Sequence, residues 1–222
     1  NLYVVGLEQV HHFRQVFKVA ELMGLKKAGV ARHISFGLIQ DESGHKMSTR
    51  KGALITAQTT IDRAVKKALQ IVKEKSPDLK DKEVVAKIIG VGALQYVNLF
   101  QNRNTNIIFD WEKVLSFDGN TGPYLQYTYA RIQGILRKIF DAPDHADLSV
   151  LTDPREIAIL KHLYKLPEST EIAAAEYAPN YVADYVFTLA SLFNDFYNNV
   201  PVLKAEPKER DARMLLLKAV AY

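Results

Sequence analysis

A short basic segment between two glycines constrains the fold of this chain more than any other part of the sequence. Residues 44–52 read GHKMSTRKG and follow an apolar run, residues 34–39, that has the composition of a buried strand. Cationic loops with hydroxyl groups at the C-terminal end of a strand are typical of ligand sites in α/β folds. Lysine and arginine there neutralise phosphate oxygens, and glycine lets the backbone approach a ligand closely. The segment therefore indicates an α/β domain with a phosphate-binding loop. The alternative is an exposed basic loop without a ligand.

Composition and charge narrow the classes of partner and compartment. The formal net charge of +4 and the pI of about 9.0 favour an anionic partner without requiring one. The chain has no cysteine, which excludes disulfides and thiolate metal sites and fits a reducing compartment. No apolar run approaches the roughly 20 residues that cross a bilayer, and no signal peptide begins the sequence. We therefore expect a soluble, cytoplasmic protein of one or two domains without membrane contact.

The first residues read as an internal strand of such a domain. Residues 2–5 form the apolar run LYVV and are followed by Gly6. A strand at this position needs partners from elsewhere, so we expect the chain to begin partway through an α/β domain; a helical protein with one stray hairpin is the less favoured alternative. The helix expected from about Glu8 to Met23 carries Gln9 and His12 one turn apart, where both can face a ligand above the strand ends. A satisfied structural histidine is the alternative for His12. The expected buried face of this helix consists of Phe13, Val16, Phe17, Ala20 and Met23.

Two further helices are expected after the basic segment. The second of them follows Asp81 as its N-cap, and Gly90 and Gly92 within it predict close packing against a neighbour. Trp111, the only tryptophan, is expected in the core, with stacking against Arg103 as the alternative. The expected inward positions of the first helix, which starts near Thr60, are Ile61, Val65, Ala68, Leu69 and Val72.

A second informative segment, residues 118–131, reads DGNTGPYLQYTYAR. Pro123 fits the first turn of a helix, with Asn120 or Thr121 near the cap. Tyr124, Tyr127 and Arg131 recur at three and then four residues, on a stripe separate from the expected packed face. Two aromatic rings and a guanidinium on one exposed face suit splayed single-stranded bases, whereas core or rim packing is the alternative for the tyrosines. The expected packed face consists of Leu125, Tyr129, Ile132, Leu136, Ile139 and Phe140.

The remaining sequence predicts helices only. They are expected to open at Asp153-Pro154, near Glu168, near Tyr181 and after Pro207. Two helical hairpins packed against the Tyr124 helix would form a bundle.

Three motifs together resemble one family. The basic segment is not a Walker A loop, because G-x-x-x-x-G-K-[ST] is absent. Residues 46–50, KMSTR, instead resemble the KMSKS loop of class I aminoacyl-tRNA synthetases, and residues 47–52, MSTRKG, resemble its arginyl-tRNA synthetase version. Residues 3–13, YVVGLEQVHHF, are similar to the segment Y-V-V-x-x-x-Q-x-x-H-F of that family. Residues 119–124, GNTGPY, followed by a helix to Arg131, resemble the start of its anticodon-binding domain.

The resemblance implies roles for particular residues. Lys46, Ser48, Arg50 and Lys51 would act on the ATP phosphates, with Arg50 or Lys51 supplying the charge of the second KMSKS lysine, because Thr49 stands in its place. His12, Lys46 and Met47 would bind ATP, and Gln9 would contact the arginine substrate. Many members have aspartate at the position of Gly6, so that carboxylate role does not carry over. Residues implied to bind the tRNA anticodon are Asn120, Tyr124, Tyr127 and Arg131.

The resemblance also implies the organisation and activity of the chain. Residues 1–117 would be the C-terminal part of a Rossmann-type catalytic domain with connecting helices, and residues 118–222 a helical anticodon-binding domain. The implied activity is arginine–tRNA ligase, with ATP, arginine and tRNA(Arg) as partners, magnesium carried by ATP rather than by a protein metal site, and a monomeric state. No H-x-G-H motif is present, so this chain alone is not expected to aminoacylate. A non-catalytic tRNA-binding module or pseudo-synthetase fragment is the alternative.

Overall fold

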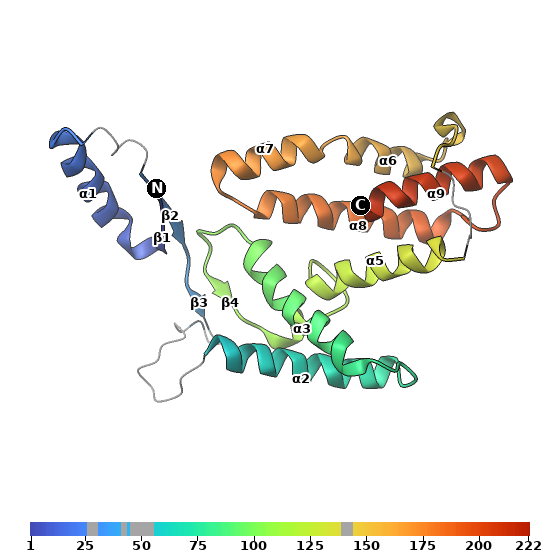
Figure 1. Ribbon diagram of the computed structural model, residues 1–222, viewed down its shortest axis with the longest axis horizontal. Coiled ribbons are helices and arrows are strands. Elements are labelled where there is room, and N and C mark those ends of the chain that lie inside the picture. Colours follow the sequence, from blue (N-terminus) through green and yellow to red (C-terminus); the bar gives the residue numbers. More distant parts are fainter. Residues whose placement is uncertain (26–30, 41–43, 45–55, 139–143) are drawn as a thin grey trace.

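The computed structural model describes residues 1–25, 31–40, 44, 56–138 and 144–222, and the statements below concern these residues. Figure 1 shows a small strand–helix–strand unit at one end, a pair of crossed helices below, and a bundle of helices that includes the C-terminus. Most of the chain is helical, and its strands are short, as an α/β part followed by an all-α part predicts. None of the described helices is both long and apolar enough to cross a membrane.

The N-terminal unit has β-α-β connectivity. Strand β1 (Leu2–Gly6) is followed by a short 3₁₀ helix (Leu7–Gln9), helix α1 (Val10–Leu22) and strand β2 (Arg32–Phe36), which pairs in parallel with β1. The ring of Tyr3 on β1 lies 5.5 Å from that of Phe13 and 5.6 Å from that of Phe17, between centroids.

The predicted buried face of α1 is wrong for the described chain. Phe13 and Phe17 are partly covered, but Val16 and Met23 are exposed, Met23 at 71%. Among the described residues, α1 packs against β1, β2 and the short 3₁₀ helix, and these elements are too narrow to cover the whole apolar stripe of a helix.

The apolar run of residues 34–39 divides into two strands instead of forming the predicted buried one. Strand β2 ends at Phe36, and β3 (Ile39–Gln40) pairs in parallel with β4 (Ile107–Ile108). The division lies at Gly37, where a Cβ atom would clash with the Thr105 carbonyl. The Gly37 amide donates a hydrogen bond of 2.6 Å to the Arg103 carbonyl oxygen. Of this run, Ser35 is the one buried residue, and Phe36 and Ile39 are exposed.

Helices α2 (Ala57–Lys75) and α3 (Lys82–Leu99) pack closely against each other. Small side chains line the contact, and a Cβ atom at Gly90 would lie 2.8 Å from the Val65 amide nitrogen. The close packing predicted from the glycines of this helix is therefore confirmed. The short helix α4 (Trp111–Val114) packs beside them, with Trp111 partly buried and the Arg63 guanidinium carbon 4.7 Å from its ring centroid. Stacking on Trp111 thus involves Arg63, whereas Arg103 was the predicted alternative.

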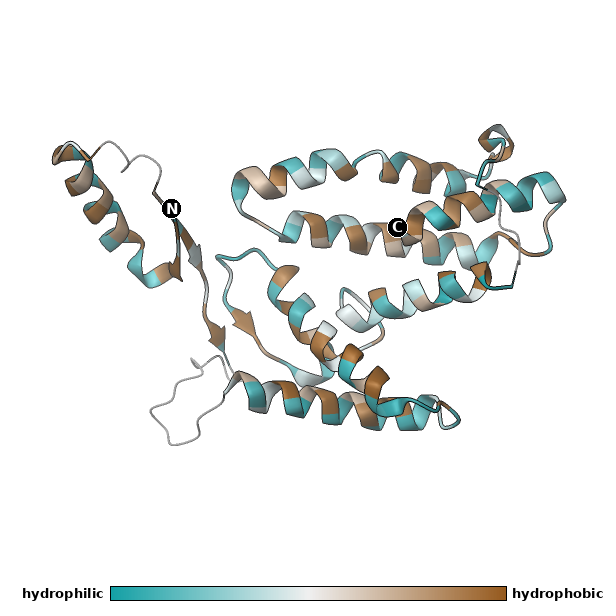
Figure 2. Ribbon diagram, in the orientation of Figure 1, coloured by the Kyte–Doolittle hydropathy of each residue, from teal (hydrophilic) through white to brown (hydrophobic). Residues whose placement is uncertain are grey.

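The C-terminal part is a bundle of α5 (Gly122–Leu136), α6 (Pro154–Leu163), α7 (Leu166–Glu176), α8 (Asn180–Asn199) and α9 (Pro207–Ala221), with a 3₁₀ turn at Leu148–Val150. Proline lies in the first turn of α5, α6, α7 and α9, where its missing N–H costs no intrahelical bond. Figure 2 shows apolar residues along each of these helices, alternating with polar ones. The centre of the core consists of Ile132, Ile159, Leu189, Phe193, Phe196, Met214, Leu216 and Leu217.

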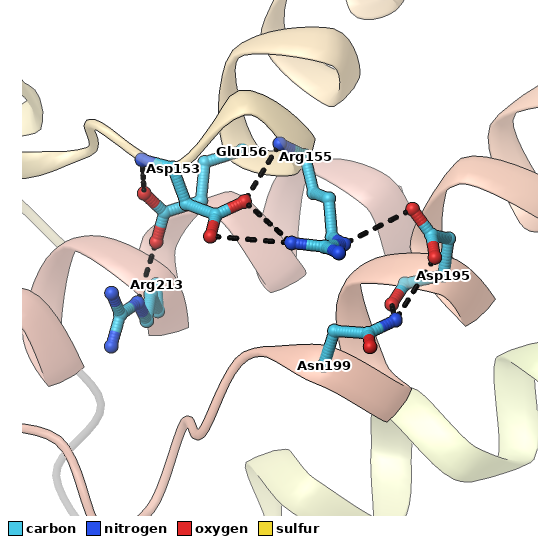
Figure 3. A network of polar contacts seen from close by, with 6 residues as sticks. All are labelled: Asp153, Arg155, Glu156, Asp195, Asn199 and Arg213. Atoms are coloured by element: carbon cyan, nitrogen blue, oxygen red, sulfur yellow. Dashed lines mark hydrogen bonds and ion pairs between the residues drawn. The ribbon is translucent and has the colours of Figure 1, made fainter.

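A buried ion pair joins α6 to α9 inside this bundle (Figure 3). Glu156 is 0% exposed and accepts hydrogen bonds from the Arg213 Nε and from the Asp153 backbone amide. Arg213 also donates to the Pro201 carbonyl oxygen at 2.9 Å, so the loop before α9 is held as well. At the rim of the same network, the Arg155 Nε lies 3.2 Å from the Asp195 carboxylate on α8.

Candidate nucleic-acid interface

The start of α5 is fixed by a side-chain cap. Thr121 has extended backbone angles, and its hydroxyl oxygen accepts a hydrogen bond of 3.2 Å from the Tyr124 amide. The same hydroxyl donates to the Ser116 carbonyl oxygen at 2.6 Å. Of the two residues predicted near this cap, Thr121 is therefore the N-cap, and Pro123 lies in the first turn as predicted.

The packed face of α5 differs from the predicted one. Ile132 is buried as expected, but Tyr129 is 53% exposed, so its assignment to the packed face is wrong. Thr128 and Ile135, which were not among the predicted residues, are also buried. The difference arises because α8 approaches α5 along the Tyr124–Thr128 side, where its polar residues supply partners for the hydroxyl groups.

Asn194 on α8 forms hydrogen bonds with three polar side chains of α5. Its Nδ2 lies 3.0 Å from the Tyr124 hydroxyl and 2.9 Å from the Thr128 hydroxyl. Its Oδ1 accepts a hydrogen bond from the Arg131 guanidinium at 2.5 Å. The amide therefore fixes Tyr124 and Arg131 relative to each other, and Tyr124 is partly buried against Phe187 with 5.6 Å between ring centroids.

Arg131 lies between two tyrosine rings. Its guanidinium carbon is 4.7 Å from the Tyr127 centroid and 4.6 Å from the Tyr197 centroid, and the guanidinium donates to the Tyr127 hydroxyl at 3.1 Å. Both distances are within the range of cation–π attraction. Tyr127 is 50% exposed and Tyr197 is 40% exposed, so both rings keep accessible surface. No carboxylate of the described residues forms an ion pair with Arg131. The arrangement offers stacking surfaces beside a positive charge.

Asn120 lies apart from this group. Its Oδ1 accepts a hydrogen bond of 2.5 Å from the hydroxyl of Tyr96 on α3, and that hydroxyl also lies 3.3 Å from the Ala183 carbonyl oxygen on α8. Burial, and secondarily the charge of Asp184, raises the pKa of Tyr96 to about 12, so the phenol remains a neutral donor. Asn120 therefore connects α3 to the start of α5.

The N-terminal candidates lie where a ligand edge is expected. Gln9 ends the 3₁₀ helix that directly follows β1, and His12 lies in the first turn of α1. Both side chains are exposed just beyond the carboxyl end of β1. Lys46, Met47, Ser48, Arg50 and Lys51 lie outside the described residues, so their placement relative to Gln9 and His12 stays a prediction.

Asn194 and Tyr197 contact the candidate residues Tyr124 and Arg131, and the sequence interpretation did not name them. They are spaced three apart on α8, as Tyr124 and Tyr127 are on α5, and this spacing places polar side chains on one stripe. The apolar pattern of α8, which includes Leu189 and Phe193, concealed this signal.

Comparisons with known proteins cover both parts of the chain. Residues 1–111 match the family model described as tRNA synthetases class I (R), catalytic domain, and residues 125–222 match the DALR anticodon binding domain. The division predicted between residues 117 and 118 falls in the stretch between the two matches and stays a prediction.

Individual relatives agree with these matches. The arginine–tRNA ligase of Streptococcus uberis is 42% identical over 221 residues, covering 100% of this chain and 39% of the relative. The arginine–tRNA ligase of Halothermothrix orenii is 38% identical over 221 residues, covering 99% of this chain and 39% of the relative. The structure of Thermus thermophilus arginyl-tRNA synthetase superimposes with a TM-score of 0.89 at 32% identity, covering 99% of this chain and 38% of that one. The chain thus spans about two fifths of the length of these relatives.

Proposed function

We propose, from the premise that this chain belongs to the class I arginyl-tRNA synthetases, that it supplies the phosphate loop and the anticodon-binding bundle of an arginine–tRNA ligase. In the proposed reaction, the arginine carboxylate attacks the α-phosphorus of ATP, giving arginyl-adenylate and pyrophosphate. A terminal ribose hydroxyl of tRNA(Arg) then takes the arginyl group. Because the chain covers only 39% of the length of its Halothermothrix orenii relative, the complete reaction is proposed for the complete protein.

The arrangement of Arg131 between Tyr127 and Tyr197 supports this proposal most directly. Anticodon bases are single-stranded and splayed, and such bases bind by stacking on aromatic rings and guanidinium planes. Two half-exposed rings around a cation that has no carboxylate partner among the described residues match that requirement. Tyr124, Tyr127 and Arg131 are the proposed anticodon contacts, and Asn120 is proposed to contribute by holding the start of α5.

The catalytic roles rest on the motifs. Negative charge builds on the phosphates during activation, so this chemistry needs positioned cations rather than a protein nucleophile. Lys46 with Arg50 or Lys51 would supply those cations, and the Ser48 hydroxyl would donate to a phosphate oxygen. Met47 and His12 would border the ATP, and Gln9 would contact arginine. We propose magnesium carried on ATP, a cytoplasmic location and a monomeric state.

ATP–pyrophosphate exchange in the complete protein, with and without tRNA(Arg), tests the proposed activity. Lys46→Ala should lower the activation rate by about 10²–10³-fold, which is about 3–4 kcal/mol of transition-state stabilisation. A change under threefold would defeat the assignment of Lys46. Binding of tRNA(Arg) without any exchange activity would favour the alternative, a tRNA-binding pseudo-synthetase.

A further inference from the structure

A further aromatic ring, that of Phe117, contacts Tyr127. The ring of Phe117, in the connection before α5, meets the Tyr127 ring edge-on at 90°, with 6.4 Å between centroids. The Lys75 Nζ lies 5.1 Å from the centroid of Phe117. We call this alternation of cations and aromatic rings the cation–aromatic row. In order, it consists of Lys75, Phe117, Tyr127, Arg131 and Tyr197.

Lys75 is distinguished from other lysines by its partner. It is the last residue of α2, where the negative end of the helix dipole favours a cation. On the same helix, Lys67 forms an ion pair of 3.0 Å with Glu112. Within the described ranges no carboxylate lies at ion-pair distance from Lys75, and its ammonium group lies against Phe117 instead. An ammonium held by a ring keeps its N–H donors for an anion, since the ring offers no lone-pair acceptor.

We propose that Lys75 binds a backbone phosphate of the RNA whose bases stack on Tyr127 and Tyr197, and that Phe117 is a positioning residue that holds Lys75 there. The proposal rests on the proposed function, because it assumes that the bundle binds tRNA. It adds a contact from α2, outside the matched anticodon-binding domain, so that one RNA segment would bridge the two parts of the chain.

The order of the row favours RNA over an acidic peptide. A polynucleotide carries a regularly spaced anion beside every base, so rings and cations can be occupied together. An acidic peptide would neutralise Lys75 and Arg131 but would leave the rings without stacking partners. Competition by polyglutamate as strong as that by tRNA would therefore overturn the proposal.

The test is the salt dependence of tRNA(Arg) binding to wild type, Lys75→Ala and the matched control Lys73→Ala. Lys73 is an exposed lysine two residues earlier on α2, so it points to a different side of the helix. Lys75→Ala should weaken binding about two- to fivefold at low salt. It should also make the negative slope of log K against log salt less steep by about 0.7–0.9, since one phosphate contact is lost. Lys73→Ala should change neither quantity.

The positioning role of Phe117 has its own readout. Phe117→Leu should make the slope of log K against log salt less steep, as Lys75→Ala does. In the double variant Phe117→Leu with Lys75→Ala, the slope should equal that of Lys75→Ala alone. An additive effect would show that Phe117 acts independently of Lys75. Circular dichroism of Phe117→Leu checks that α5 remains folded.

The outcomes separate this proposal from the proposed function. If Tyr127→Ala weakens binding while Lys75→Ala behaves as Lys73→Ala does, the phosphate contact is refuted and the anticodon assignment stands. If wild type fails to bind tRNA(Arg), the phosphate contact and the anticodon assignment are both refuted. Equal weakening by Lys75→Ala toward tRNA(Arg) and an anticodon-swapped tRNA supports a phosphate contact, because a phosphate carries no sequence information.

Discussion

Replacing Arg213 with methionine should destabilise the helical bundle strongly. Methionine retains much of the aliphatic volume but leaves Glu156, which is 0% exposed, without its cationic partner. Removing one member of a buried ion pair costs about 3–5 kcal/mol, because the remaining charge is neither hydrated nor compensated. The Pro201 carbonyl also loses a donor, which adds about 1 kcal/mol. We expect a loss of about 4–6 kcal/mol in the free energy of unfolding.

Arg155→Met is the matched control from the same network in Figure 3. The side chains of Arg155 and Asp195 are 37% and 59% exposed, so water and salt screen their ion pair. Such a pair contributes less than about 1 kcal/mol. The double substitution Glu156→Gln with Arg213→Met should recover part of the loss, since a neutral amide oxygen still accepts the Asp153 amide hydrogen bond without a buried charge.

Urea unfolding followed by far-UV circular dichroism measures these differences. Trp111 lies beside α2 and α3, so its fluorescence would report on the other part of the chain. Amide hydrogen exchange at α6 and α9 assigns the loss to the bundle. The reasoning is refuted if Arg213→Met costs no more than Arg155→Met, or if the double variant is less stable than Arg213→Met alone.

Three further substitutions test how the helices pack. Tyr96→Phe removes the donor to Asn120 and should cost about 1–3 kcal/mol by denaturation. Because the pKa of Tyr96 is raised from 10.0 to about 12, its contribution is present below pH 10 and lost as the pH rises through 12, and Tyr96→Phe should remove that dependence. Gly90→Ala forces a Cβ against the Val65 backbone and should cost about 1–3 kcal/mol. Gly134 lies in open space on α5, so Gly134→Ala should be neutral or stabilising by up to about 1 kcal/mol. If Gly134→Ala were less stable than Gly90→Ala, the packing argument would be contradicted.

Local signals in the sequence predicted much of the fold. Helix starts at Thr121 and Asp153-Pro154 were predictable because caps and first-turn prolines act within one turn. The tight contact at Gly90 was predictable because glycine inside a helix implies a close neighbour. The family was predictable because three separate motifs occur in the expected order.

Features that depend on distant partners were not predictable. Exposed Tyr129 lies on the apolar stripe of α5, and only the approach of α8 decides that Thr128 is buried instead. Asn194 and Tyr197 gain their significance from Arg131, which lies 63 residues from Asn194 in sequence. The break of the strand at Gly37 depends on Thr105, which is also remote in the sequence. Periodicity reports one element at a time, so it cannot specify which faces meet.

Equilibrium binding of tRNA(Arg) and an anticodon-swapped tRNA to wild type and Tyr127→Ala tests the central claim most directly. If a base stacks on Tyr127 beside Arg131, the substitution should cost about 1–3 kcal/mol toward tRNA(Arg). Wild type should also prefer tRNA(Arg), and the substitution should reduce that preference. Equal weakening toward both tRNAs would contradict the account, because Tyr127 would then contribute only packing.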